Sequence, residues 1–253
     1  MSYPNTLGSK VALVVGGSGG IGAAASRLLA EAGAQVAVTY RPDGQGEAAA
    51  ADLVRALPGR KHLALAADVA SSASLIALRD AISQKFGRLH ILVNAAGFTK
   101  PVSHADLEAL DDDLIDRMFQ VNWRGQFATI RTFAPLLKAS GDGQIVSISS
   151  IAALTGIGSS IAYCAAKAGI DVMTKSLARA LAPNIRVLAV APGVVDTAFV
   201  PGRSADFNEK VAAATPLKRV GQPEEIAAAI LACATHLTFS TGTTIVVDGG
   251  RSL

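Results

Sequence analysis

The sequence contains little cysteine and little charge, and these shortages exclude several kinds of protein. Only two of the 253 residues are cysteines, Cys164 and Cys233, which is too few for a disulfide framework. Charged residues make up 17% of the chain, and the net charge of +3 comes without a basic run interleaved with aromatics. This pattern argues against nucleic acid as a partner.

Long apolar runs and clustered metal ligands are missing as well. No stretch reaches the roughly 20 apolar residues of a membrane-spanning helix, so we expect no membrane partner. Residues 1–10 are polar and lack the order of a signal peptide, so we expect a reducing cytoplasm. The four histidines are scattered without ligand spacing, and we predict no metal site.

The chain does contain a regular alternation of short apolar runs and Ala-rich amphipathic stretches. Such alternation is typical of an α/β fold, with a parallel sheet covered on both faces. We find no linker or repeat, and predict a single domain over residues 1–253 with a Rossmann-type, doubly wound sheet of about seven strands. The predicted strands span residues 11–15, 35–40, 62–67, 89–93, 144–149, 185–191 and 243–247. The predicted helices span residues 21–32, 46–57, 72–86, 110–137, 161–181 and 223–234.

A glycine-rich turn joins the first predicted strand to the first predicted helix. It reads Gly16-Gly17-Ser18-Gly19-Gly20-Ile21-Gly22. Glycines permit a tight turn and a close backbone approach to a pyrophosphate, and the helix N-terminus adds N–H donors. The spacing differs from the common Gly-x-Gly-x-x-Gly, and a merely flexible turn is the alternative. Its place between strand and helix favours a dinucleotide site.

The end of the second predicted strand indicates which dinucleotide binds. NAD-binding folds usually place Asp or Glu about 20 residues beyond the glycines, to hold the ribose 2′-hydroxyl. Here Val38-Thr39-Tyr40-Arg41 ends the strand without an acid. Arg41 is suited to pair with a 2′-phosphate, so we predict that NADP(H) is preferred, with NAD(H) as an alternative. A solvated loop charge is the other interpretation of Arg41.

The clearest chemical signal is a tyrosine and a lysine four residues apart. Tyr163 and Lys167 share one face of a predicted helix, and Ser150 lies upstream. A free tyrosine has a pKa of about 10, which a nearby cation lowers. The pair is therefore predicted to act as a general acid/base with the serine hydroxyl as a second donor. An ordinary helix face is the alternative.

Taken together, the motifs resemble those of the short-chain dehydrogenases/reductases, in order and spacing, over almost the whole chain. The matching elements are Gly16-x-x-x-Gly20-x-Gly22, Asp68-Val69, Asn94-Ala95-Ala96-Gly97, Asn122, Ser150, Tyr163-x-x-x-Lys167, Pro192-Gly193 and Asp248-Gly249-Gly250. One departure is Val15, which stands where the family often has a threonine that braces the glycine turn. We expect that hydrogen bond to be lost.

The resemblance implies a catalytic set of four residues. Tyr163 would donate the proton when a ketone is reduced, and Lys167 would lower its pKa and hydrogen-bond the nicotinamide ribose. Ser150 would hold the substrate oxygen. Asn122 would lie beside Lys167 and order a water chain for proton relay.

The resemblance also implies the cofactor contacts. Asp68 and Val69 would meet the adenine ring, Asn94 would brace the central strands, and Thr197 would bind the nicotinamide amide. The full predicted set is Gly16, Ser18, Gly20, Ile21, Gly22, Tyr40, Arg41, Asp68, Val69, Asn94, Ala95, Gly97, Lys167, Pro192, Gly193, Val195 and Thr197.

The leading hypothesis is an NADP(H)-dependent oxidoreductase that interconverts a ketone and a secondary alcohol. The first alternative is a 3-oxoacyl-thioester reductase of the fatty-acid synthesis type, for which Arg124, Arg131 and Lys138 are candidate carrier contacts. An enoyl reductase is disfavoured because the related enoyl enzymes separate Tyr and Lys more widely. A non-catalytic nucleotide-sensing regulator is a different class, but such proteins tend to lose the Tyr or the Lys.

The small-molecule substrate pocket is predicted only in outline. Its expected apolar walls are Phe98, Ile151, Ala152, Leu154, Ile157, Val194 and Phe199, because they adjoin the catalytic segments. Residues 198–215 lie where the family carries a substrate lid, and residues 200–206 are expected to form a loop. The Ala-rich stretches near 124–138 and 164–181 match faces that the family uses to pair subunits. We therefore expect a homotetramer, with a dimer as the alternative.

Overall fold

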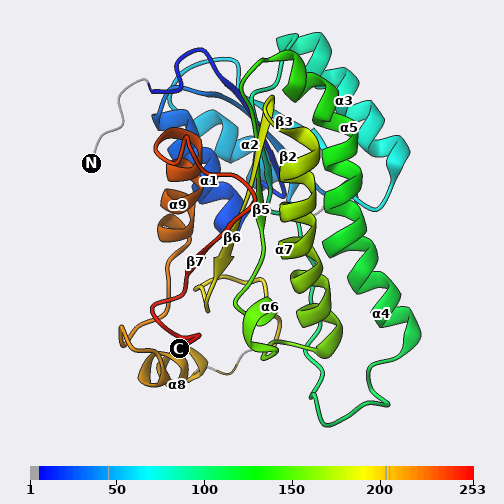
Figure 1. Cartoon of the computed structure of the whole chain (residues 1–253), viewed down its shortest axis with the longest axis vertical. Helices are drawn as coiled ribbons and strands as arrows, with labels where there is room; N and C mark the ends of the chain where they lie inside the picture. The colour runs from blue at the N-terminus through cyan, green and yellow to red at the C-terminus, as the bar shows by residue number, and fades with distance from the viewer. Residues whose placement is uncertain (1–5, 45, 203, 205) are drawn as a thin grey trace.

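The computed structural model describes residues 6–44, 46–202, 204 and 206–253. Within them a single sheet of seven strands has the order β3-β2-β1-β4-β5-β6-β7, and every neighbouring pair is parallel (Figure 1). The strands are β1 (Val11–Val15), β2 (Gln35–Tyr40), β3 (Leu63–Ala66), β4 (Ile91–Asn94), β5 (Gly143–Ile148), β6 (Ile185–Pro192) and β7 (Thr244–Val247). The predicted doubly wound parallel sheet is confirmed.

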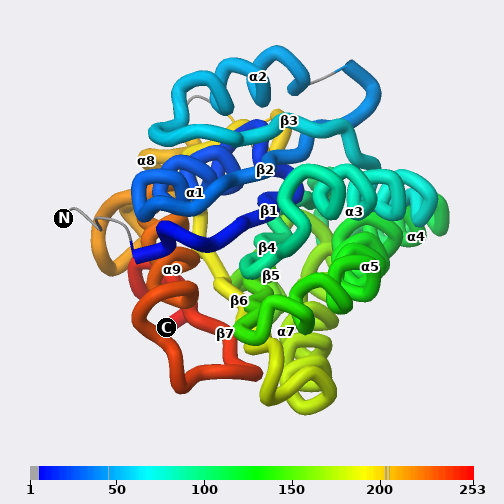
Figure 2. The backbone as a smooth tube through the Cα atoms, turned by 90° about the horizontal axis from the view of Figure 1, so that it is seen from above, coloured from blue at the N-terminus to red at the C-terminus, as the bar shows by residue number. Residues whose placement is uncertain are grey.

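Helices cover both faces of the sheet, as Figure 2 shows from above. Alternate residues of β1 point into opposite layers: Val14 packs with α1, α2 and α9, whereas Leu13 packs with α3, α5 and α7. This two-sided burial explains the unbroken apolar runs of the central strands. The helices are α1 (Gly20–Glu31), α2 (Glu47–Ala56), α3 (Ser72–Phe86), α4 (Asp112–Phe119), α5 (Gly125–Ala139), α6 (Ala152–Thr155), α7 (Ile161–Leu181), α8 (Phe207–Ala214) and α9 (Pro223–Thr235).

The strand order reverses between β1 and β4. From β1 the chain runs outward through β2 to β3, and then crosses back to β4 on the other side of β1. The connections that leave the carboxyl ends of β1 and β4 therefore go to opposite faces of the sheet. In open α/β sheets a crevice forms at this switch point, and ligands bind there.

The region predicted as one helix over residues 110–137 differs from that prediction. The side chain of Asp111 accepts a hydrogen bond from Leu114 N at 2.7 Å, so the helix begins at Asp112. A π-helical turn, η1 (Gln120–Arg124), then separates α4 from α5. Such turns admit an extra residue and are frequent at functional sites. The continuous α-helix was the wrong expectation because the sequence does not show this change of hydrogen-bond spacing.

Two short helices were not predicted from the sequence. The four-residue helix α6 follows β5, and α8 occupies part of the predicted lid segment. In Figure 1 both lie at the lower end of the molecule, below the carboxyl end of β6. Within the described part of the chain, none of the helices combines the length and apolar character needed to cross a membrane.

Candidate active site

A cavity of about 1410 Å³ lies at the carboxyl ends of the strands. Its wall includes the glycine turn, the ends of β2 and β4, the start of α7 and the segment between β6 and α8. Small-molecule pockets usually measure about 300–1,000 Å³. The cavity is therefore large enough for a dinucleotide together with a small substrate.

The start of α7 places the predicted tyrosine and lysine on the cavity wall. Ser160 caps this helix, because its hydroxyl accepts a hydrogen bond from Tyr163 N at 3.1 Å. The cap fixes Tyr163 in the first turn and Lys167 one turn later. Ser150, between β5 and α6, lines the same cavity. The structure thus brings Ser150, Tyr163 and Lys167 together, as the sequence predicted.

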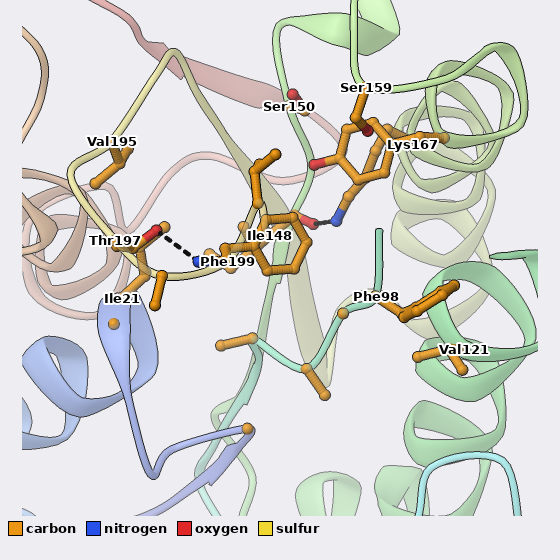
Figure 3. A pocket seen from close by; sticks show the side chains of 18 of the residues that line it. Ile21, Phe98, Val121, Ile148, Ser150, Ser159, Lys167, Val195, Thr197 and Phe199 are labelled. Atoms are coloured by element: carbon orange, nitrogen blue, oxygen red, sulfur yellow. Dashed lines mark hydrogen bonds between the residues drawn. The ribbon is translucent and has the colours of Figure 1, made fainter. Parts of the chain in front are cut away.

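Lys167 is buried, with only 3% of its surface exposed. Its Nζ donates a hydrogen bond to the carbonyl of Ile148 at 2.7 Å, the dashed bond beside Lys167 in Figure 3. The same ammonium lies 5.6 Å from the centre of the Tyr163 ring. Burial lowers the lysine pKa to about 8, while the negative charge of Asp171 acts in the opposite direction. The carbonyl of Ile148 uses one of the three ammonium N–H groups.

Burial raises the pKa of Tyr163 to about 12. A side-chain hydrogen bond with Ser150 acts against this rise, and the neighbouring Cys164 adds to it. The expected lowering of this pKa by Lys167 is not found, because burial dominates and the ammonium is directed at Ile148. At neutral pH the phenol therefore holds its proton, which is the form required of a proton donor to a carbonyl.

Asn122 lies behind the cavity wall rather than on it. The side chain is fully buried in η1, and its Oδ1 accepts from Phe98 N at 3.0 Å. Its Nδ2 donates to Phe98 O at 2.8 Å and to Met118 O at 3.0 Å. Asn122 thus joins the π-turn to the backbone that follows β4. Its placement beside Lys167 and its part in a proton relay stay predictions.

The glycine turn has no room for a side chain at two of its positions. A Cβ on Gly16 would lie 2.6 Å from Ala96 N, and one on Gly22 would lie 2.1 Å from Gly16 O, so neither position accepts a side chain. Gly19 precedes α1 without a side-chain cap, and a Cβ there would meet nothing within 4 Å. The first N–H groups of α1 therefore face an open part of the cavity, where an anion is stabilised.

Thr39 braces the turn from the next strand. Its Oγ1 accepts a hydrogen bond from Gly16 N at 3.0 Å, and its carbonyl accepts one from Gly17 N at 3.1 Å. Val15 has no hydroxyl, and the hydroxyl of Thr39 in β2 accepts a hydrogen bond from the turn instead. The turn therefore keeps a side-chain hydrogen bond that the sequence comparison suggested it had lost.

The end of the cavity beside the last residues of β2, where the adenosine of a cofactor is expected and which is called the adenosine end below, contains an acid that the sequence analysis missed. Arg41 Nε donates to Asp43 Oδ2 at 2.8 Å, and Arg41 Nη2 makes a second, shorter contact with the same oxygen. Both residues line the cavity. The strand itself ends without an acid, as predicted, but Pro42 turns the chain so that Asp43 comes back to the arginine. A 2′-phosphate would compete with this carboxylate for the guanidinium.

All but one of the predicted cofactor residues line the cavity. The exception is Asn94, which is buried in β4 with its Nδ2 3.4 Å from Ser147 Oγ in β5. That position fits the predicted bracing role. The lining members are Gly16, Ser18, Gly20, Ile21, Gly22, Tyr40, Arg41, Asp68, Val69, Ala95, Gly97, Lys167, Pro192, Gly193, Val195 and Thr197.

The half of the cavity between α4, the start of α7 and the segment before α8, where the substrate is expected and which is called the substrate half below, has mostly apolar walls. Phe199, from the segment before α8, packs near Tyr163 with ring centres 6.2 Å apart. Figure 3 shows Phe98 on the side of η1, across the cavity from Thr197. Of the expected wall residues only Leu154 is absent from the wall, and it is 57% exposed on α6.

The sequence analysis missed two arginines on this half, Arg117 on α4 and Arg251 near the C-terminus. A retrospective signal for Arg117 is its spacing of one helical turn from Val121, which also lines the cavity. The candidate carrier contacts Arg124, Arg131 and Lys138 are not part of the wall.

Comparison with known proteins agrees with this geometry. Residues 16–252 match a family model described as Enoyl-(Acyl carrier protein) reductase. The chain is 40% identical over 245 residues to cis-4-hydroxycyclohexanecarboxylate dehydrogenase of Sinomonas cyclohexanicum, covering 95% of this chain and 96% of that protein. It is 34% identical over 255 residues to the 3-oxoacyl-[acyl-carrier-protein] reductase FabG of Chlamydia muridarum, covering 96% and 98%.

A solved structure shows the same architecture. The crystal structure of a chain assigned to the short-chain dehydrogenases/reductases from Burkholderia xenovorans superposes with a TM-score of 0.89 at 35% identity, covering 96% of this chain and 97% of that one. The family model and these relatives span the glycine turn, the Tyr163–Lys167 pair and the lid segment alike. The chain therefore belongs to the short-chain dehydrogenase/reductase family of nicotinamide-dependent oxidoreductases.

Proposed function

We propose that this protein transfers a hydride between NADP(H) and a ketone or secondary alcohol, with Tyr163 as general acid/base. The observation that supports this most is that Tyr163, Ser150 and Lys167 share one cavity with an uncapped glycine turn. The turn fits a pyrophosphate, and the phenol is protonated at neutral pH.

The proposed mechanism assigns each step to a side chain. The bound nicotinamide supplies the hydride in reduction and accepts it in oxidation. The hydroxyls of Ser150 and Tyr163 donate hydrogen bonds to the carbonyl oxygen and polarise it. Tyr163 then gives its proton to that oxygen as the alcohol forms. Lys167, close to the ring, stabilises the resulting phenolate until a proton from solvent restores the phenol.

Replacement of the phenol tests the proposal directly. Tyr163→Phe removes one oxygen and should lower kcat by about 10²–10⁴-fold, since that is the usual contribution of a positioned general acid. NADPH affinity, measured by fluorescence titration, should stay unchanged. Undiminished turnover in this variant would contradict the assignment of Tyr163 as the general acid/base, whereas no turnover by the wild type on any substrate would favour the non-catalytic alternative.

The substrate is proposed as a small or medium ketone, because the substrate half of the cavity is apolar and bounded by Phe98 and Phe199. A panel should contain simple ketones, sugars, β-keto thioesters and 4-oxocyclohexanecarboxylate, each followed with NADPH by loss of its absorbance. The last compound is the ketone corresponding to the alcohol named for the Sinomonas relative.

A 3-oxoacyl-thioester reductase is the second candidate, favoured by the likeness to FabG. It requires room at the mouth for a phosphopantetheine arm. The three basic residues first considered for carrier contact lie off the cavity wall, which makes this candidate the weaker one. Faster turnover of a β-keto thioester than of every small ketone would reverse this order.

We propose NADP(H) as the preferred cofactor and a homotetramer as the assembly. Arg41 is exposed at the adenosine end, where a 2′-phosphate would lie. For the assembly, Val172 is 62% exposed on α7, and Val246 is 43% exposed on the edge strand β7, so both elements present apolar surface for a second copy. Light scattering measures the assembly. A reducing cytoplasm remains the proposed compartment.

A further inference from the structure

Two arginines line the substrate half of the cavity, and the proposed mechanism uses neither. Arg117 lies on α4 with its guanidinium carbon 5.1 Å from the centre of the Phe98 ring. Arg251 lies near the C-terminus, where its Nη1 is 3.5 Å from both Val211 O and Thr215 Oγ1. They reach the cavity from different elements, Arg117 from α4 next to η1 and Arg251 from the chain beside α8.

Among the described residues, this half of the cavity has no acid to balance them. The two lining carboxylates, Asp43 and Asp68, both belong to the adenosine end. In the same part of the chain, no carboxylate oxygen lies within the 4.0 Å ion-pair distance of Arg117 or Arg251. Arg41, by contrast, is paired with Asp43. A cleft lined by one sign of charge raises the local concentration of the opposite ion.

The two arginines are held in different ways. Thr215 is buried and donates its own hydroxyl hydrogen to Val211 O at 2.8 Å, so Arg251 rests on a fixed pair of oxygens. Both contacts of Arg251 are made by Nη1. A guanidinium carries five N–H groups in a planar fork that matches a carboxylate, so the N–H groups on Nε and Nη2 can bind one. Arg117 is more exposed and is kept in place by the Phe98 ring.

We propose that Arg251 binds a carboxylate of the substrate and that Arg117 strengthens the positive potential at the mouth. The substrate class is then a small ketone or alcohol that carries a carboxylate away from the reacting carbon. This inference rests on the proposed function for the reacting group. A phosphate of a carrier arm presents similar anionic chemistry, and the experiment separates it from a carboxylate.

The test compares 4-oxocyclohexanecarboxylate with its uncharged methyl ester, using the full-length enzyme and NADPH. Arg251→Gln should lower kcat/KM for the acid by about 10–100-fold and leave the ester unchanged, since a hydrogen bond to a charged group is lost. Arg117→Gln should lower kcat/KM for the acid by only about threefold to tenfold. Higher salt should reduce this difference between the variant and the wild type.

Arg131→Gln is the matched control. Arg131 also lies over an aromatic ring, 5.9 Å from the centre of Phe127, but it is on α5 and off the cavity wall. Arg131→Gln should leave kcat/KM unchanged for both the acid and the ester. An equal loss for acid and ester in Arg251→Gln, or no loss for either, would overturn the carboxylate site while ester reduction keeps the proposed function intact. A loss confined to phosphopantetheine thioesters would overturn it too and assign the anion to a carrier arm.

A binding measurement keeps the inference testable if no ketone is reduced at all. Calorimetry would then follow cyclohexanecarboxylate added to the NADPH-saturated protein. Binding that Arg251→Gln weakens about tenfold or more supports the subsite even though the proposed reaction has failed. No binding to the wild-type complex would overturn the subsite.

Discussion

The two halves of the cavity are built by different means. The half that fits a dinucleotide is formed largely by backbone: the glycine turn after β1, the start of α1 and the segment after β4. The half that fits a substrate is formed by side chains from segments far apart in the chain, such as Arg117 on α4 and Arg251 near the C-terminus. Backbone geometry leaves little freedom to the residue type, whereas a side-chain wall admits many solutions. We therefore expect the substrate half to vary more between related proteins than the half that fits a dinucleotide.

The glycine turn should show the largest effect of any backbone change. Gly22→Ala places a Cβ 2.1 Å from Gly16 O, so we expect loss of both stability and NADPH binding. Gly19→Ala places its Cβ in open space. That variant should keep its melting temperature but bind NADPH about 100-fold more weakly, because the methyl group occupies the phosphate position. Thermal melts and fluorescence titration separate the two outcomes.

If Gly19→Ala bound NADPH as the wild type does, the backbone of this turn would not be the phosphate site. The comparison between the two halves of the cavity would then lose its first member.

Lys167 should support catalysis but lower the stability of the folded protein, because its charge is buried. Its pKa falls from 10.5 to about 8 on folding, so the unfolded chain binds more protons between those values. The loss of folding stability caused by the buried charge is complete below about pH 8 and disappears above about pH 10.5. Lys167→Met should therefore raise the melting temperature at pH 7 by up to a few degrees. The gain in the free energy of unfolding is at most about 3 kcal/mol, and it should be absent at pH 10.5.

The same variant should lose ketone reduction, because the cation beside the phenolate is gone. A lower melting temperature at pH 7 would show that the bond to Ile148 O outweighs the buried charge. Circular dichroism melts at both pH values provide the measurement.

The Arg41–Asp43 pair should give the smallest effect. Asp43→Asn removes the carboxylate that competes with a 2′-phosphate, so NADPH affinity should rise about threefold to tenfold while NADH affinity changes little. Arg41→Ala should lower NADPH affinity alone. Titration of both cofactors against both variants measures this. Equal changes for NADH and NADPH would remove the pair from cofactor choice.

The sequence predicted features that depend on short spacing. Tyr163 and Lys167 stand one helical turn apart whatever surrounds them, and the glycines follow a strand that is recognisable by itself. It could not predict features that depend on distant contacts. The hydroxyl missing at Val15 is replaced by that of Thr39, which lies 23 residues along the chain from the Gly16 N–H that it accepts from.

Electrostatic expectations failed for a related reason. The spacing of Tyr163 and Lys167 gave the right neighbours but the wrong balance, because burial was not visible in the sequence. Lys167 is buried against the end of β5 at Ile148, and Tyr163 packs near Phe199 from the segment before α8. Asp43 was overlooked because the search for an acid ended with the strand, although a turn returns it to Arg41.

The hydrogen bonds of Asn122 limit how new specificities can arise on this framework. Both polar atoms of its amide are hydrogen-bonded to the backbone of Phe98. The main chain at that point of the wall is therefore held in place and cannot move back to admit a bulkier molecule. Room must instead be gained by shortening the side chain at position 98 or by moving the segment before α8 that carries Phe199. Redesign for larger ketones should therefore begin with the side chain at position 98 and leave the loop length untouched.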